Sequence, residues 1–356
     1  MDDYELLQKR LETAYERNRL RKYPELHYLF FELTDQCNLH CLHCGSNCGA
    51  RGSSFLVSEK VLEIIRNVSV KEPRVHIVLT GGEPLLHPDF SLIMEELHHA
   101  HLYWSVVTNA MLITDDMARK MKECHIYSAS VSIDGTAEDH NLLRQNPAAY
   151  DLAVRGIYNL KKYDIPVQVT SVITKRTLPK LEQIHSVISK MNVFSWKVLN
   201  IEPIGRAEDN GDLLLSRDEL FQLFDFIRKY RETPDENDNG MEITYGCSHF
   251  LPFPYEGTVR DAPFLCGAGI MIASVQCSGD IAACLDIERR QELVQGNIYK
   301  DDFFEVWQNR FRIFRRERTE ESELCNECRY ALLCGGDSFH TWDFDLKRPR
   351  LCLLTQ

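Results

Sequence analysis

Long hydrophobic runs are missing from this 356-residue sequence, so we expect no segment to cross a membrane. Basic and apolar residues are also scarce at the start, where two aspartates follow Met1, so we expect no secretion signal and a cytoplasmic location. Positive charge is in deficit. Because 41 Lys and Arg face 53 Asp and Glu, the net charge of -12 argues against a nucleic-acid partner. We find no convincing repeat and no extended low-complexity segment, and the length suits two globular domains.

Cysteine, by contrast, is abundant. The chain has 13 cysteines, and cytosolic proteins rarely use cysteine for disulfides, so metal binding or redox chemistry is the better explanation. The cysteines form an early and a late group, with only Cys124 between them. This distribution predicts two separate metal regions.

Apolar runs alternate with helical patterns about six times, which predicts βα units and a parallel sheet of the α/β class. Such a sheet closes partly into a (βα)6 barrel of the TIM type, with an active site at the carboxyl ends of the strands. The expected strands are Tyr28–Leu33, Val75–Leu79, Tyr103–Val107, Tyr127–Ile133, Val167–Ile173 and Trp196–Ile201. The expected helices are Ser58–Val68, Phe90–His99, Thr114–Cys124, Ala149–Tyr163 and Leu178–Met191.

Three parts are expected along the chain. Residues 1–27 read as a charged helix, too short for a domain, with one face formed by Leu6, Leu7, Leu11 and Tyr15. The barrel is assigned to residues 28–230. The polar, turn-forming stretch Pro234–Gly240 follows it, and residues 231–356 are predicted to form a cysteine-rich domain of short strands and helices.

Three cysteines follow the first predicted strand with the spacing C-x-x-x-C-x-x-C: Cys37, Cys41 and Cys44. A cubane iron–sulfur cluster has four irons, so three thiolates from one loop leave one iron open. Half of a zinc site is the alternative, but zinc sites more often show two C-x-x-C pairs, and no second pair lies nearby. The other candidates of this loop are expected not to be ligands: His40, His43 and Cys48.

Polar loops follow later strands. In Thr80-Gly81-Gly82-Glu83-Pro84, the glycines allow a close backbone approach and the glutamate offers an acceptor for an ammonium group. After the fourth strand, Ser132 and Asp134 offer acceptors for hydroxyl groups, and Arg144 can pair with a carboxylate. A helix N-cap at Asp134 and a surface arginine are the alternatives.

The late cysteines have two patterns. Cys266 and Cys284 flank a turn at Gly279, which would bring them together across a hairpin. Further on, the pattern is C-x-x-C-x5-C with one distant cysteine: Cys325, Cys328, Cys334 and Cys352. Zinc remains a physical alternative for the second set.

Together these motifs resemble the radical SAM enzymes that carry a C-terminal SPASM domain. The resemblance implies that S-adenosylmethionine (SAM) chelates the open iron of the first cluster and that the Gly81–Pro84 loop holds its amino group. It assigns further SAM contacts to Asn109, Ser132, Asp134 and Arg144. Ala110 stands where the family commonly has glycine.

The resemblance also implies two auxiliary [4Fe–4S] clusters, three in all. For the second, the four cysteines from Cys325 to Cys352 match a complete ligand set. For the first, the matches are Cys247, Cys266 and Cys284. The family's next cysteine follows a Gly-Gly pair, but here Asp337 follows that pair and the usual spacing falls on Ser338. We therefore expect either Asp337 as an oxygen ligand or an exchangeable iron.

The implied reaction is reductive cleavage of SAM to methionine and a 5′-deoxyadenosyl radical, which abstracts a hydrogen from the substrate. Family resemblance favours a peptide or protein substrate that is cross-linked through a thioether or C–C bond, or oxidised as in sulfatase maturation. A small molecule such as an aminocyclitol is the enzymatic alternative. An iron–sulfur electron carrier or sensor would not need the Gly81–Pro84 loop. Expected partners are a flavodoxin or ferredoxin and a separate peptide-recognition protein.

Overall fold

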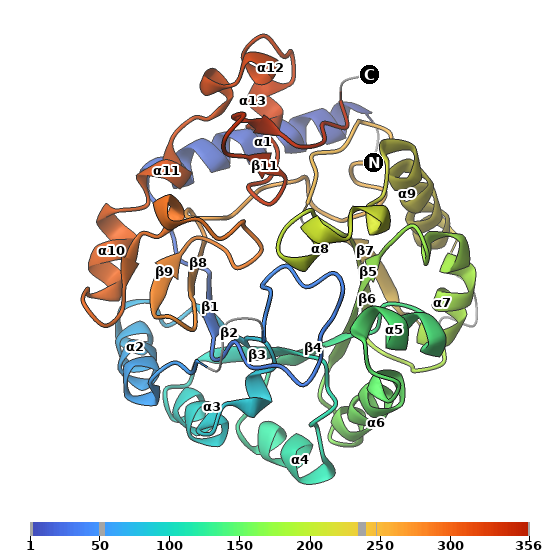
Figure 1. Cartoon of the computed structure of the whole chain (residues 1–356). Coiled ribbons are helices and arrows are strands. Elements are labelled where there is room, and N and C mark those ends of the chain that lie inside the picture. The colour runs from blue at the N-terminus through green and yellow to red at the C-terminus, as the bar shows by residue number, and fades with distance from the viewer. Residues whose placement is uncertain (1–2, 50–53, 234–239, 247, 355–356) are drawn as a thin grey trace.

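A sheet of parallel strands, surrounded by helices, forms the centre of the molecule (Figure 1). The computed structural model describes residues 3–49, 54–233, 240–246 and 248–354. Strands β1 to β6 pair in sequence order, and all pairs are parallel. Their bounds are β1 Tyr28–Glu32, β2 His76–Thr80, β3 Tyr103–Thr108, β4 Ser128–Ser132, β5 Val167–Ile173 and β6 Ser195–Asn200.

Helices connect these strands and cover the outside of the sheet (Figure 1). They are α2 Ser58–Lys71, α3 Phe90–His99, α4 Asp115–Glu123, α5 Ala137–Arg144, α6 Ala149–Lys162, α7 Leu181–Ser189, α8 Arg206–Asp209 and α9 Arg217–Glu232. The alternation predicted from the sequence is confirmed, and the α/β class with it. Helices α5, α8 and α9 were not among the predicted helices.

The sheet continues beyond six strands. At one edge β7 (Glu242–Tyr245) pairs with β6, and at the other β8 (Ile272–Val275) pairs in parallel with β1. Strand β8 turns back into β9 (Asp280–Ala282) as the expected hairpin, with Gly279 at φ 85° in the turn, and β10 (Gly296–Asn297) follows. The domain boundary near residue 230 stays a prediction, since one sheet runs across it.

The last part of the chain is made of short elements. They are α10 Phe303–Asn309, α11 Arg312–Arg315, α12 Glu323–Asn326 and α13 Ala331–Cys334, with a small sheet of β11 Trp342–Asp343 and β12 Arg348–Pro349.

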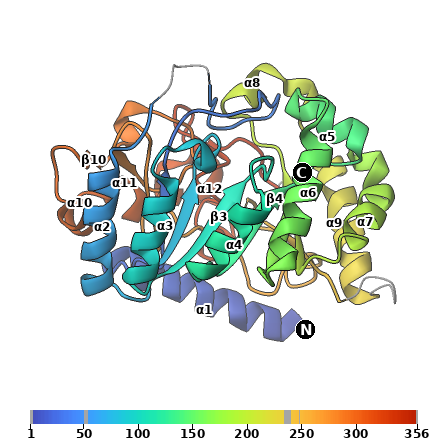
Figure 2. The same ribbon diagram turned by 90° about the horizontal axis from the view of Figure 1, so that it is seen from below.

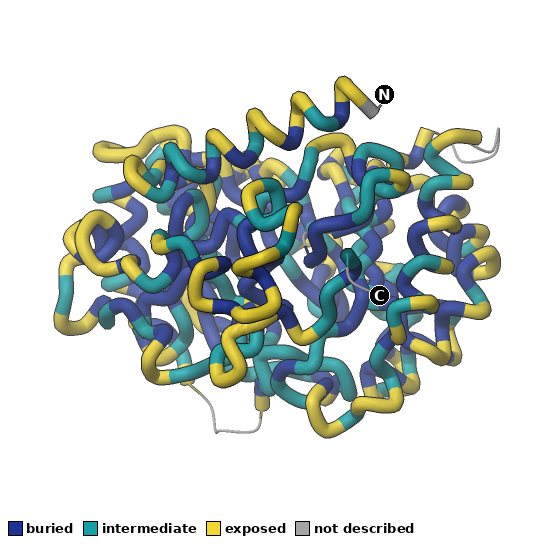
Figure 3. The backbone as a smooth tube through the Cα atoms, turned by 90° about the horizontal axis from the view of Figure 1, so that it is seen from above, coloured by how far each residue is buried: buried dark blue, intermediate teal, exposed yellow. Residues whose placement is uncertain are grey.

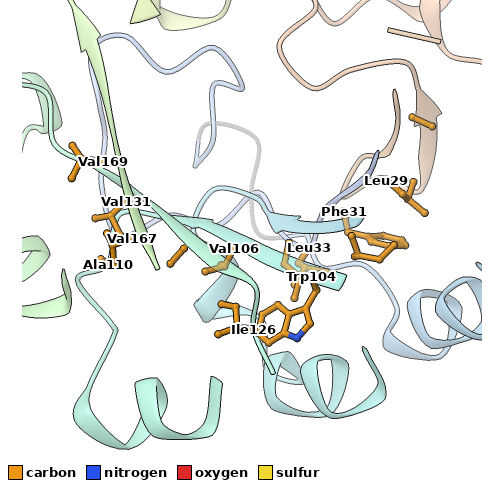
Figure 4. Close-up of a cluster of buried hydrophobic side chains, with 14 of the residues drawn as sticks. Leu29, Phe31, Leu33, Trp104, Val106, Ala110, Ile126, Val131, Val167 and Val169 are labelled. Atoms are coloured by element: carbon orange, nitrogen blue, oxygen red, sulfur yellow. The ribbon is translucent and has the colours of Figure 1, made fainter. Parts of the chain in front are cut away.

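The core lies on both faces of the sheet, as expected for parallel strands covered by helices. Buried residues run through the strands and the inner sides of the helices, and the exposed residues lie on the outer turns (Figure 3). Trp104 points from β3 toward the surrounding helices and lies beside Ile126 (Figure 4). Its indole N–H donates to the Cys124 carbonyl at 2.8 Å, which satisfies the polar atom of a fully buried ring.

The N-terminal helix α1 (Asp3–Lys22) packs against the C-terminal elements α11 and α13 (Figure 1). The predicted apolar face is wrong for Leu11 and Tyr15, which are exposed, whereas Leu6 is buried as predicted. The buried face also contains two arginines, which donate to main-chain carbonyls: Arg10 to Leu251, and Arg17 to the last turn of α13. Among the described residues, no helix is both long and apolar enough for a membrane span.

Candidate active site

The cysteine loop after β1 lies inside the ring of strands, at the end of the molecule opposite α1 (Figures 1 and 2). Of the three predicted cluster ligands, Cys41 belongs to one small buried cluster, and Cys37 and Cys44, both half-buried, pack against it. Leu39 and Met111 are among the apolar side chains packed there. The structure therefore brings the three thiols into one apolar environment at the carboxyl ends of the strands, where barrel enzymes place their sites.

Helix α8 holds this loop in place. Arg206 donates from Nε to the Cys41 carbonyl at 2.7 Å and from Nη1 to the Cys48 carbonyl at 2.8 Å. Its backbone N–H donates to the Cys44 carbonyl at 3.0 Å. Gly205 precedes it at φ 58°, and a Cβ there would lie 2.3 Å from the Gly45 oxygen. One arginine thus donates to three carbonyls of the loop and holds the loop in this conformation.

The pKa values of the thiols shift in different directions. Burial raises the pKa of Cys37 to about 12 and raises the pKa of Cys41 as well. A hydrogen bond from the Cys48 thiol lowers the pKa of Cys44 and raises that of Cys48. Thiolates at such a site need a cation to offset their charge, and cluster irons supply it. The loop therefore fits a cluster with three thiolate ligands.

The paired glycines pack against the cysteine loop itself. The Gly82 N–H donates to the Thr34 carbonyl at 2.7 Å, and the Glu83 N–H donates to the Gln36 carbonyl at 2.8 Å. A Cβ on Gly81 would lie 2.6 Å from the Thr34 oxygen, and one on Gly82 would lie 2.1 Å from the Gln36 oxygen. The glycines are required because two backbones touch here.

Glu83 is fully buried, and its carboxylate accepts from Thr108 Oγ1 at 2.8 Å and from the Asn109 N–H at 2.9 Å. Burial raises its pKa to about 7 despite these hydrogen bonds. The Asn109 side chain in turn donates to Asn38 Oδ1 at 2.7 Å. The loops after β2 and β3 are thereby joined to the cysteine loop. Ala110 adopts φ 59°, a conformation that glycine reaches without steric cost.

Asp134 lies two residues beyond Ser132, the last residue of β4, and pairs with Arg144, the last residue of α5. Arg144 Nε donates to Asp134 Oδ2 at 2.6 Å, and the Val172 N–H donates to Asp134 Oδ1 at 3.1 Å. Although burial opposes it, the Arg144 charge holds the pKa of Asp134 well below its usual range. Arg144 Nη1 also lies 3.8 Å from Cys41 Sγ. Both residues therefore border the cysteine loop, and the roles predicted for them toward SAM remain predictions.

The cysteines predicted for the second auxiliary cluster line one small cavity of about 20 Å³: Cys325, Cys328, Cys334 and Cys352. Burial raises the pKa of Cys334, whose sulfur accepts from the Asp337 N–H at 3.1 Å. Four thiols around one cavity, with a backbone donor on sulfur, fit a cluster with four protein ligands.

The ligand set predicted for the first auxiliary cluster is less complete. Cys247 lies outside the described residues. The Asp337 carboxylate accepts from the Phe250 N–H at 2.8 Å and lies 3.2 Å from His249 Nδ1. Cys284 Sγ instead lies 3.4 Å from His340 Nε2. Cys266 packs, half-buried, against the main core.

A cavity of about 230 Å³ lies between the cysteine loop and the C-terminal segment. It is lined by His43, Cys44 and Gly45 of the loop and by Asp286 and His340 of the C-terminal segment. Its sides come from the ends of β5 and β6: Val172, Leu199, Asn200, Ile201, Glu202 and Ile204. This cavity is the space in which a substrate could meet the cysteine loop.

Comparison with known families agrees with this arrangement. The profile of the radical SAM superfamily matches residues 31–184. The chain contains a radical SAM domain. The profile of an iron–sulfur cluster-binding domain, SPASM, matches residues 266–329, downstream of the radical SAM domain. The two domains therefore support SAM and iron–sulfur clusters as cofactors.

Curated relatives cover most of the chain. Mycofactocin maturase MftC of Mycobacterium tuberculosis (strain CDC 1551 / Oshkosh) is 27% identical, over 86% of this chain and 77% of its own length. An AdoMet-dependent heme synthase of Methanosarcina barkeri is also 27% identical, over 86% of this chain and 89% of its own. The structure of Streptococcus suis SuiB bound to its precursor peptide SuiA superposes with a TM-score of 0.73, covering 95% of this chain and 78% of SuiB at 16% identity. That likeness establishes the fold.

Three residues of the site were not predicted to belong to it: Arg206, Asp286 and His340. The string Gly205-Arg206-Ala207 after the sixth predicted strand is only a weak signal, and the contacts of Arg206 with the cysteine loop depend on the fold. Asp286 follows Cys284 by two residues, and His340 lies two residues beyond Ser338, the position on which the family's usual cysteine spacing falls. Those spacings were the available signal, but only the fold shows that the two residues meet.

Proposed function

We propose that this chain is a radical SAM enzyme that modifies a peptide or protein, by oxidising a side chain or by forming a thioether or C–C cross-link. The carrying observation is the cavity between Cys44 and the C-terminal segment. A substrate there lies between the radical SAM loop and the cysteine-rich segment. The relative named as a mycofactocin maturase and the peptide-bound structure of SuiB support a peptide substrate.

Cys37, Cys41 and Cys44 would hold a [4Fe–4S] cluster, and the cluster with bound SAM would supply the radical chemistry that abstracts a hydrogen atom from the substrate. The residues of the chain position the reactants. Arg206 fixes the cysteine loop, and Glu83 offers its carboxylate to the SAM ammonium group.

The proposal includes further components. The second auxiliary cluster is assigned to the cavity of Cys325, Cys328, Cys334 and Cys352. The sequence also predicts a third cluster, on Cys247, Cys266, Cys284 and Asp337, but this cluster is not part of the proposal, because Cys284 contacts His340 and Asp337 accepts from the Phe250 N–H. A flavodoxin or ferredoxin would supply the electron, a separate protein would recognise the peptide, and the enzyme would work in the cytoplasm.

A small-molecule substrate is the second candidate. It is favoured by the AdoMet-dependent heme synthase, which is as similar in sequence as the maturase and is covered over 89% of its length. Apolar side chains on the cavity walls, including Leu199 and Ile201, would also suit an extended apolar molecule.

Hydrogen transfer to SAM separates the two candidates. Native-host extract from cells grown in D2O is split into peptides and small molecules, and each fraction is added to reduced, cluster-loaded protein with SAM. We expect deuterium in 5′-deoxyadenosine with the peptide fraction. Deuterium transfer from the small-molecule fraction alone would establish the second candidate. A variant with alanine at Cys37, Cys41 and Cys44 is the control and should form no 5′-deoxyadenosine.

A further inference from the structure

Three metal-ligating side chains meet at the cavity that Cys44 also lines. Cys284 lies just after β9, Asp286 lies two residues later, and His340 lies between α13 and β11. Their ligand atoms all lie within 4.8 Å of one another. His340 is buried, Cys284 is half-buried and Asp286 is exposed. A thiol, an imidazole and a carboxylate therefore converge from two distant parts of the chain.

The distance between the thiol and the imidazole matches binding to one ion. Tetrahedral zinc with its usual bonds to sulfur and nitrogen places those two atoms about 3.5 Å apart. Cys284 Sγ and His340 Nε2 are 3.4 Å apart. Ligands on different irons of a cubane point outward from separate corners and would be more widely spaced. The pair therefore fits a single metal ion better than two corners of a cluster.

Asp337, the predicted oxygen ligand, is engaged elsewhere. Its carboxylate holds the backbone at Phe250 and contacts His249, and its carbonyl accepts from Arg318. These contacts tie the segment after α13 to residues 249–250. Asp337 is also absent from the converging group of ligand atoms. His340 is the residue that this segment delivers to Cys284.

We propose that Cys284, Asp286 and His340 bind one divalent transition-metal ion, zinc or iron, whose open coordination position faces the cavity. Three protein ligands with an open position are typical of metal ions that bind substrate, whereas structural sites have four. Asp286 and His340 line the same cavity as His43 and Cys44. The ion would hold a donor group of the substrate, such as a thiolate or carboxylate, in the cavity that the radical SAM loop also lines. This substrate role rests on the proposed function, but the binding of the ion does not.

Cobalt titration tests the site, because Co²⁺ bound by a thiolate absorbs through charge transfer. Cluster-loaded, zinc-depleted protein should take up about one Co²⁺ per chain with this absorption, and added Zn²⁺ should abolish it. Cys284→Ser should lose the absorption, and His340→Ala should weaken Co²⁺ binding at least about tenfold. His340→Cys should retain binding, because it supplies another ligand, which separates ligation from a structural role. Cys277→Ser, in the turn of the same hairpin, is the matched control and should bind as wild type.

Two results would overturn the proposal. One is unchanged cobalt absorption in Cys284→Ser. The other is the loss of about four irons in that variant, which would assign Cys284 to a [4Fe–4S] cluster. SAM cleavage is measured in the same samples, so that the proposed function is tested separately from the metal site. Wild-type protein that binds cobalt here but never cleaves SAM would contradict the proposed function and leave the metal site standing.

Discussion

Arg144 and Asp134 form a buried ion pair, with Nε and Oδ2 2.6 Å apart, directly beside the cysteine loop. The family resemblance assigned both residues to contacts with SAM. The pair instead makes them one unit, in which each charge offsets the other. A change at either residue is therefore expected to affect stability as well as SAM binding.

Arg144→Ala should lower the free energy of unfolding by about 3–5 kcal/mol, because it leaves the Asp134 carboxylate buried without its partner. Asp134→Asn combined with Arg144→Ala should recover part of this loss, which a double-mutant cycle in urea would measure on the cluster-free protein. Arg119→Ala, in an exposed ion pair on α4, is the control and should unfold as wild type. Equal stability of Arg144→Ala and Arg119→Ala would show that the buried pair contributes nothing.

SAM affinity should increase as the pH rises through about 7. Burial raises the pKa of Glu83 to about 7, so below that pH the SAM-free site holds a neutral acid. The SAM ammonium favours the carboxylate, so binding must then release a proton, and affinity should fall up to about tenfold per pH unit below 7. Calorimetric titration with SAM from about pH 5.5 to about pH 7.5 measures this change. The range stays below the pKa of a free amino group, so the SAM ammonium keeps its charge.

Glu83→Gln provides the comparison, because its amide does not titrate. It should bind SAM more weakly than wild type, and the pH dependence below 7 should largely disappear. Parallel pH profiles in the two proteins would exclude Glu83 as the titrating contact.

Much of the fold was predictable because the barrel strands are local apolar runs. Strand β5 and helix α3 match their predicted bounds, and the hairpin turn at Gly279 was marked by its glycine. Helix α1 shows the limit. Its hydrophobic pattern suggested Leu11 and Tyr15 on the inner face, but the helix buries Arg10 and Arg17. Distant main-chain carbonyls satisfy these guanidinium groups, and no local pattern encodes such partners.

The candidate site also has parts that could be predicted from the sequence and parts that could not. The cysteine loop and the Gly81–Pro84 loop could be predicted because each is a short contiguous motif. The contact between Cys284 and His340 spans 56 residues and depends on how the segment after α13 returns to the sheet. Asp337 attracted attention through its spacing, although its carboxylate contacts residues 249–250.

Gly82→Ala should prevent assembly of the first cluster. Its new Cβ would lie 2.1 Å from the Gln36 oxygen, one residue before Cys37, so one of the two loops must move. Iron content after anaerobic reconstitution should fall by about four per chain, and SAM cleavage should be lost. Gly211→Ala is the matched control, because a Cβ there meets no atom within 4 Å. Full iron content in Gly82→Ala would show that the loops adjust to the methyl group.

The four late cysteines can be tested separately from the first loop. Cys334→Ala should lose about four irons per chain, because it removes one of the four thiols around the cavity, while SAM cleavage without substrate should persist. Cys124→Ala is the control, since that cysteine is buried at the end of α4 and should bind no iron. Metal analysis and electron paramagnetic resonance of anaerobically purified protein provide the measurement. Zinc in the wild type that is lost from Cys334→Ala, without any change in iron, would replace the second auxiliary cluster by a four-thiolate zinc site.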